Sequence, residues 1–561
     1  MGIAGFARRL DRHATRYSPE DLSGSNAVID GPSLAYHAHK LALAAAVNKS
    51  NVSRIPSYAD IAQQALRWLR ALDAINIKVS TILFDGALPK TKQHERVTRN
   101  DRYNQQVNGL RSNYPSEACP IPTSLGPASY AFLAPALRET LGDSEYASIT
   151  STVPGEADDW CAPYANKHPK SVIFSDDTDL LLYDFPGEVR IIFFRDTDLW
   201  PEPKLKGYYP PRICQDLGLS NLGTFAYCLS QDPFKSETAL IEEAQSVNRA
   251  SGSYHNFIER YTTGFTTANP FDTQWANPSL QNLDVRTSEF VFQSLDSTPK
   301  PTIYLPFLVE DKHRASAWNI GQDLRAVAYS FVAAEQSNVQ EHRRKAQKVT
   351  MHEIELYPLH DLPATVRTYT ESIRVWLEWS TKRKVPGELV WPLYAIGMVL
   401  PELNTPPSFA QLLRILSGDF DNSWNFIHLT ACLHAGLYSL RVVKQCVDVW
   451  LSLNNDSSSP LLDHAKQLQL GLQQIGSISE LFLVPGQGKR ALGDAEVVRE
   501  LLVEIYASAK VEVPLERKSN KKAKKQQREA ERKGRRKQET ATQTDSNVFD
   551  VLAFMNAARK S

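Results

Sequence analysis

The chain has 561 residues, of which 42% are hydrophobic and 22% are charged, proportions typical of a globular protein. This length exceeds that of one ordinary domain, so we expect two or more. No apolar run approaches the roughly 18 residues that span a bilayer, and the N-terminus lacks the apolar core of a signal peptide, so we expect neither a membrane protein nor a secreted one.

Residues 1–235 alternate short apolar runs with helical patterns. Asp60–Ile75, for example, carries apolar residues at helical spacing. This alternation predicts an α/β domain in which a central, mostly parallel sheet is flanked by helices. The runs that we expect to be strands are "NAVIDG" (Asn26–Gly31), "VSTILFDG" (Val79–Gly86), "SVIFSDD" (Ser171–Asp177) and "VRIIFFRDTD" (Val189–Asp198).

The remaining segments differ in composition. Within the first domain, residues 100–150 are polar and indicate an irregular excursion. Residues 236–300 indicate a loop-rich connection, and the patterns of residues 301–512 predict a mostly α-helical domain. Residues 513–545 have almost no apolar content and are expected to form a disordered basic tail. Residues 546–558 regain apolar side chains and predict a short amphipathic helix suited to docking on the protein itself or on a partner protein.

Acidic residues gather where the predicted strands end. Asp30 ends the first strand and Asp85 the second, and Asp177 and Asp179 follow the third. The carboxyl ends of parallel strands are where ligands bind in such sheets. Any single acid there is more often a helix cap or a solvated loop residue. Several acidic motifs together favour a shared site, because crowded carboxylates repel one another unless cations such as Mg²⁺ or Mn²⁺ neutralise them.

The first 235 residues resemble the flap endonuclease/XPG nucleases of the PIN-like superfamily, and among these the Asteroid-type proteins. The motifs that carry the resemblance are "MGIAGFARRL", "VIDGPSLAYH", "FDGALPKTKQHERVTR", "VPGEADDWCA" and "SDDTDLLLY". The resemblance implies two bound Mg²⁺ or Mn²⁺ ions and a nucleic-acid partner, with DNA favoured over RNA. The metal ligands that it implies are Asp30, Asp85, Glu156 and Asp158 for one ion, and Asp177, Asp179 and Asp232 for the other.

The resemblance also implies residues that act on the nucleic acid. Lys92 and Arg99 match a basic pair on the family's gateway helix and would offset charge on the scissile phosphate. Gly2 matches the N-terminal glycine near that gateway. Two features depart from the family pattern. The glycine-rich duplex-binding turn expected after Asp232 is replaced by "PFKSETALIEEAQSV", and residues 100–150 have few periodic basic residues for a helical arch.

The basic tail dominates the charge distribution. Residues 516–538 hold twelve Lys or Arg and three Glu, a net charge of +9, so the rest of this electrically neutral chain carries −9. Such a tail is typical of phosphate binding or of nuclear import, and we expect a nuclear location, with the cytoplasm as the alternative. Six cysteines without a CxxC pair predict reduced thiols in an intracellular protein. The tail residues expected to bind nucleic acid are Lys521, Lys522, Lys524, Lys525, Arg535, Arg536 and Lys537.

Two functions compete on these observations. The first is a divalent-metal-dependent, structure-selective endonuclease that hydrolyses phosphodiester bonds in single-stranded, flap or overhang DNA, as in DNA repair. The alternative is a catalytically inactive PIN-like scaffold that binds RNA or proteins in post-transcriptional regulation. The complete set of seven acids favours the enzyme, whereas the missing glycines and the acidic body favour the scaffold.

Overall fold

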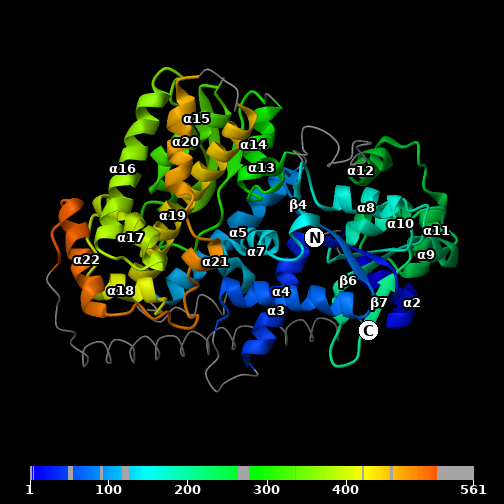
Figure 1. Ribbon diagram of the computed structural model, residues 1–561. Helices are drawn as coiled ribbons and strands as arrows, with labels where there is room; N and C mark the ends of the chain where they lie inside the picture. The colour runs from blue at the N-terminus through cyan, green and yellow to red at the C-terminus, as the bar shows by residue number, and fades with distance from the viewer. Residues whose placement is uncertain are drawn as a thin grey trace, which may run out of the picture.

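The structure is a computed structural model that describes residues 3, 5–47, 55–88, 92–115, 125–262, 277–296, 298–334, 336–419, 423–454 and 459–514. Figure 1 shows an α/β half on the right and a helical half on the left. Helices α3, α4, α5 and α7 lie in the middle of the molecule, where the two halves meet. Gly2, the basic tail and the segment 546–558 lie outside the described residues, so the expectations for them remain predictions.

The α/β half is built on a seven-stranded sheet with the strand order β1-β7-β6-β5-β2-β3-β4. The strands from β6 to β4 in this order are parallel, and β7 is antiparallel to both β6 and β1. The predicted mostly parallel sheet is therefore confirmed. The strands are β1 (Thr15–Tyr17), β2 (Asn26–Asp30), β3 (Lys78–Asp85), β4 (Thr150–Val153), β5 (Ser171–Ser175), β6 (Val189–Asp198) and β7 (Lys204–Tyr208).

Alternating residues of the central strands are buried on opposite faces of the sheet. In β2, Ile29 belongs to the apolar core that includes α3 and α4, whereas its neighbour Val28 belongs to the core that includes α8 and α10. This period of two is the geometry of a strand covered on both sides. The helices of this half are α1 (Phe6–Leu10), α2 (Pro19–Leu22), α3 (Gly31–Val47), α4 (Tyr58–Ala74), α5 (Gln93–Asn113), α7 (Leu133–Gly142), α8 (Asp158–Lys167), α9 (Pro210–Leu217) and α10 (Leu222–Gln231).

Two segments are more regular than the sequence predicted. The expected irregular excursion at 100–150 contains most of α5 and all of α7, and the expected loop-rich connection at 236–300 contains four helices. Helix α5 has almost no apolar stripe, since only Asn104 and Val107 are buried in it. Val107 packs in a small apolar cluster with Trp424 and Ile427 of the other half, and polar contacts add to this, including an ion pair of 3.0 Å between Arg111 and Asp311. The four helices are α11 (Glu237–Ser246), α12 (Gly252–Thr262), α13 (Pro278–Gln281) and α14 (Thr287–Leu295).

The helical half surrounds one long helix, α19 (Trp424–Leu453). This helix is long and apolar enough to cross a membrane by length and composition, which the sequence analysis did not anticipate, but 94% of its most apolar window is buried inside the protein. Its neighbours are α15 (Gln322–Val332), α16 (Leu362–Lys382), α17 (Gly387–Val399), α18 (Phe409–Ser417), α20 (Leu461–Leu472), α21 (Ile478–Leu481) and α22 (Ala495–Ser508). A small sheet of β8 (Thr302–Tyr304), β9 (Asn338–Lys345) and β10 (Lys348–Glu355) completes this half.

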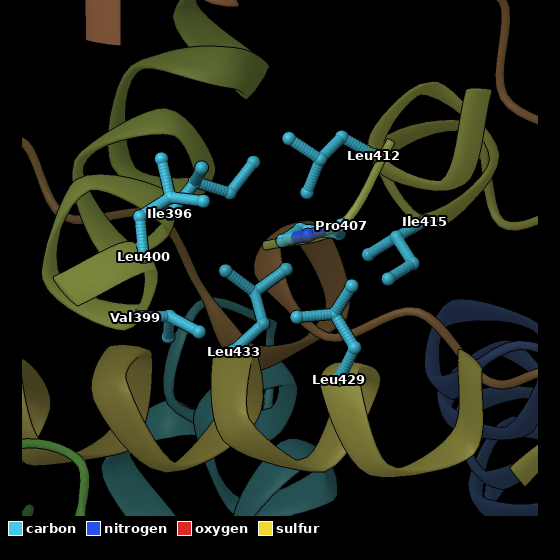
Figure 2. A pocket seen from close by; sticks show the side chains of 8 residues that line it. All are labelled: Ile396, Val399, Leu400, Pro407, Leu412, Ile415, Leu429 and Leu433. Atoms are coloured by element: carbon cyan, nitrogen blue, oxygen red, sulfur yellow. The ribbon is translucent and has the colours of Figure 1, made fainter. Parts of the chain in front are cut away.

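The helical half contains a void between α17, α18 and α19 that is purely apolar (Figure 2). Its volume is about 10 Å³, room for no more than one water molecule. Because no polar group faces it, a water molecule there would lack hydrogen-bond partners. The void is a packing gap and not a ligand site. Its lining residues are Ile396, Val399, Leu400, Pro407, Leu412, Ile415, Leu429 and Leu433.

Candidate active site at the carboxyl edge of the sheet

Asp30 and Asp85 occupy the carboxyl ends of two adjacent parallel strands. Asp30 is 5% exposed at the end of β2, and its carboxylate accepts hydrogen bonds from the hydroxyls of Ser33 and Ser175. The carboxylate of Asp85, at the end of β3, accepts a hydrogen bond of 2.8 Å from the backbone N–H of Ala157. Pairing of β2 with β3 therefore brings the two acids to one edge of the sheet, as predicted.

Glu156 and Asp158 reach the same edge from the loop that leads into α8. Glu156 forms an ion pair of 2.7 Å with the Nζ of Lys92. Asp158 is the first residue of α8, and its Oδ1 is buried without a hydrogen-bond partner among the described residues. A buried polar atom without a partner is costly, so its presence calls for a ligand that the protein chain itself does not supply.

Asp177 and Asp179 follow β5 in a short 3₁₀ turn. The Asp177 carboxylate accepts a hydrogen bond of 3.0 Å from the N–H of Asp179 and caps this turn. Asp179 is 9% exposed, and its carboxylate accepts a hydrogen bond of 3.2 Å from the N–H of Ile3. The start of the chain thus packs against this part of the site.

The pKa values of these acids are raised by burial and by the charges of neighbouring acids. Burial, followed by the negative charge of Asp85, raises the pKa of Asp30 to about 6. Burial raises the pKa of Glu156 to about 7, and burial followed by the charge of Asp177 raises that of Asp179 to about 7. Burial also raises the pKa of Asp158 well above its usual range, and the charges of four other acids add to this effect.

Six of the seven predicted metal ligands therefore form one patch, which we call the acidic patch: Asp30, Asp85, Glu156, Asp158, Asp177 and Asp179. The described contacts of the seventh, Asp232, do not link it to the other six acids. Asp232 ends α10, and its carboxylate accepts a hydrogen bond of 3.0 Å from the N–H of Phe234 within its own turn. The sequence does not reveal where the end of α10 lies relative to the ends of the strands.

Lys92 is the cation of the acidic patch. It stands at the N-terminal end of α5, and its charge is opposed by burial but favoured more strongly by Glu156, Asp177 and Asp158, so its pKa is raised. Arg99 lies on the same helix seven residues later, about two turns away, as predicted for a shared face. Its charge acts on Tyr36 of α3.

Sequence reasoning missed residues that support the site. Ser33 and Ser175 orient Asp30; Ser33 is only three residues away in the chain, whereas Ser175 is 145 residues away and no local pattern pairs it with Asp30. Arg96, on α5, forms an ion pair with the buried Glu289 of α14. Arg286 lies just before α14, and its charge acts on Asp85 and on Tyr36, whose side chain is 46% exposed. Arg286 and Glu289, at the start of α14, thus add two charged groups to the surroundings of the acidic patch.

The donor chemistry of the acidic patch suits a divalent cation. Carboxylate oxygens are the ligands that Mg²⁺ and Mn²⁺ prefer, and the partnerless Oδ1 of Asp158 is available for such a bond. The raised pKa values are those expected of carboxylates that a cation would relieve. Across the described residues, however, no three His, Cys, Asp or Glu side chains are already arranged to hold a metal ion. Lys92 provides the positive charge instead.

Comparison with known families agrees with this geometry. Residues 129–356 match the family model described as "XPG domain containing". The matched stretch contains Glu156, Asp158, Asp177 and Asp179 of the acidic patch. Over this stretch the chain is similar to XPG domain-containing proteins, and the predicted resemblance is confirmed.

A curated relative makes the resemblance more specific. The chain is 31% identical over 166 residues to Asteroid homolog 1 of Schizosaccharomyces pombe (strain 972 / ATCC 24843), an alignment that covers 30% of this chain and 26% of that protein. The match thus spans about a quarter of the relative's length.

Three solved structures align with part of this chain at low sequence identity. The alignment with the catalytic core of Rad2 in complex with DNA substrate (complex II) covers 48% of this chain and 75% of the Rad2 chain, with 17% identity and a TM-score of 0.28. Human GEN1 in complex with Holliday junction DNA overlaps 47% and 62%, with 15% identity and a TM-score of 0.30. Flap endonuclease-1 from Methanococcus jannaschii overlaps 45% and 83%, with 16% identity and a TM-score of 0.30.

Proposed function

We propose that this protein is a divalent-metal-dependent nuclease that hydrolyses phosphodiester bonds in DNA, acting on single-stranded, flap or overhang substrates. The observation that carries the proposal is the acidic patch, in which Asp158 is buried among like charges with one oxygen left without a partner. A folded chain gains nothing from such crowding unless it binds a cation there.

In this proposal the acids of the patch bind the metal ions, and neighbouring groups orient two of these acids. Asp30, Asp85, Glu156, Asp158, Asp177 and Asp179 would hold Mg²⁺ or Mn²⁺. Bound divalent cations supply a water molecule of lowered pKa and stabilise the departing oxygen. Ser33 and Ser175 fix the orientation of Asp30, and the N–H of Ala157 fixes that of Asp85.

The two basic residues of α5 act on the substrate. Lys92 lies within 2.7 Å of Glu156 and so is positioned to offset negative charge on a phosphate that enters the patch. Arg99 would bind the adjoining backbone phosphate. Because α5 is anchored to the helical half through Arg96 and Arg111, both groups are held on a helix fixed at two further points.

The proposal is tested by cleavage of labelled single-stranded, flap, overhang and duplex DNA with Mn²⁺, and by the same assay on Asp177→Asn. We expect metal-dependent cleavage of at least one substrate by the wild type and a loss of about a thousandfold or more in the variant. Asn still caps the 3₁₀ turn, so the fold should be retained.

Asp176→Asn is the matched control. Asp176 is adjacent in sequence, but its carboxylate contacts Lys40 and the N–H of Arg195 and not the acidic patch. Its substitution should leave the cleavage rate within about threefold. Equal losses in both variants would contradict the assignment of Asp177.

The alternative function is an inactive scaffold that binds RNA or proteins. It is favoured by the ion pair of Lys92 with Glu156 and by the lack of a ready-made three-ligand metal site in the described part of the chain. The same assay decides between the two, because a scaffold shows no metal-dependent cleavage and no rise in melting temperature with Mn²⁺.

A further inference from the structure

The helical half carries an aromatic groove that the proposed function does not use. It lies between α16, α17 and α22, has a volume of about 780 Å³ and is open to solvent. The stacked rings of Trp376 and Trp379, with centroids 4.6 Å apart, and the ring of Tyr394 form its wall. Val375, on the rim, is 51% exposed. A volume of this size is typical of a ligand or peptide site.

The polar groups of the groove are already directed away from it or paired. The indole N–H of Trp379 donates to Glu504, and that of Trp376 donates to the carbonyl of Val390. What the groove offers an occupant is therefore apolar and aromatic surface, with Glu371 and Glu504 at its border. This combination favours an amphipathic helix over a small polar ligand.

The position of the groove in the chain points to an occupant. Ser508 and Ala509, at the end of α22, line the groove, and the described chain ends only a few residues later, at Pro514. Figure 1 shows α22 at the outer side of the helical half, on the left. The remaining 47 residues of the chain, 515–561, thus begin beside this groove.

The sequence of that remainder contains one apolar segment. Val548, Val551, Leu552 and Met555 recur at the spacing i, i+3, i+4 and i+7 of a helix face, the pattern of helix-in-groove recognition. The 31 residues that precede Ser546 are polar and would reach about 30 Å as a random coil, so the groove is within range of the tether.

We propose that residues 546–560 dock as a helix in the groove between α16, α17 and α22 of the same chain. A short tether gives such a segment an effective concentration of the order of millimolar, so modest apolar contacts suffice. Docking would hold both ends of the basic segment 516–538 at the helical half. The groove helices α16, α17 and α22 lie on the opposite side of the molecule from α8 and α10 (Figure 1).

The experiment places a photo-crosslinker, p-benzoylphenylalanine, at Phe549 in the full chain and maps the products by mass spectrometry. We expect an intramolecular product of monomer mass, joined to the residues of α16 or α22 that line the groove. Leu552→Asp, which lies outside the described fold, and Val375→Asp, on the rim, should each lower its yield at least fivefold. Val497→Asp is the control, since Val497 is similarly exposed, at 47%, on α22 but does not line the groove.

Each other outcome overturns the proposal. Products of dimer mass would assign the groove to a second copy of the chain. Products elsewhere on the body, no product, or a yield unchanged by Val375→Asp would show that the segment does not dock in the groove. Circular dichroism of Val375→Asp verifies that the variant is folded, and Leu552→Asp repeats the test without altering the folded body.

Discussion

The two halves of the molecule bury charged groups in opposite ways. In the helical half, Glu341 and Arg325 are fully buried and form an ion pair of 2.6 Å. Tyr329 donates a further hydrogen bond of 2.8 Å to Glu341, and Arg344 pairs with Glu310 at 2.6 Å. In the α/β half, six carboxylates share one region, where Lys92 forms an ion pair with Glu156 and the charges of Arg96 and Arg286 act on Asp85.

The pKa values of the buried acids shift in opposite directions in the two halves. Burial raises the pKa of Glu341, but Arg325, Arg343 and Tyr329 together outweigh burial, so this pKa is lowered. For Asp158, burial and the neighbouring acids act in the same direction and raise the pKa. A buried charge that is fully paired is explained by the fold, whereas a buried charge surrounded by like charges is typical of a site that binds something else.

The largest expected effect comes from breaking a matched pair. Glu341→Gln removes the charge and leaves Arg325 buried without its partner, so the free energy of unfolding should fall by ~3–5 kcal/mol. Urea denaturation measures this change. Glu371→Gln is the control, since Glu371 pairs with Arg374 on the surface, and its midpoint should be unchanged. A stable Glu341→Gln protein would mean that this pair does not hold the helical half.

The opposite substitution in the acidic patch should stabilise the protein. Asp158→Asn removes one of the crowded charges, and in metal-free buffer at pH 8 we expect the free energy of unfolding to rise by about 1 kcal/mol, the scale of a typical single substitution. Mn²⁺ should then stabilise the wild type more than the variant. A loss of stability in metal-free buffer would show that Asp158 is a structural group.

The pH dependence of stability sharpens the contrast. The pKa values of Glu156 and Asp179 are raised to about 7 in the folded protein, so their contribution to stability is present at low pH and is lost as the pH rises through 7. In metal-free buffer the free energy of unfolding should therefore fall as the pH rises from 6.5 to 8, most steeply below pH 7 and by less than about 1.4 kcal/mol per pH unit for each group, and the melting temperature should fall with it.

Buried histidines set the lower limit of that window. Burial lowers the pKa of His428 and of His434 to about 4, so their contribution is present above pH 6.5 and is lost as the pH falls toward 4. Scanning calorimetry from pH 6.5 to 8 avoids this second effect. A flat profile in metal-free buffer would contradict the raised pKa values of the acidic patch.

The acidic patch was more predictable than the buried ion pairs, for a physical reason. An apolar run that stops at an acid fixes both a strand and the place where that strand ends, so Asp30, Asp85 and Asp177 were readable from local sequence. The strand β9, "NVQEHRRK", looks solvent-exposed in sequence, yet Glu341, Arg343 and Arg344 are buried. Their burial depends on partners far along the chain, as do the contacts that hold the polar helix α5 and the position of Asp232.

The smallest expected effect concerns Lys92, the one group of the acidic patch that resembles the paired charges of the helical half. Lys92→Gln leaves Glu156 without its cation. In metal-free buffer at pH 8 this should cost ~1 kcal/mol of stability, the net value of a typical charge-assisted contact, and at pH 6.5 the cost should shrink because Glu156 is largely protonated.

The same variant separates stability from turnover. If Lys92 also offsets charge on the phosphate, Lys92→Gln should lower the cleavage rate by about a hundredfold with saturating Mn²⁺, because the metal ions cannot replace a donor aimed at the phosphate oxygens. Lys40→Gln is the control, since Lys40 contacts Asp176 outside the patch and is exposed. A stability change without a rate change would make Lys92 an internal counter-ion only, and the acidic patch would then resemble the paired half more closely than its six carboxylates indicate.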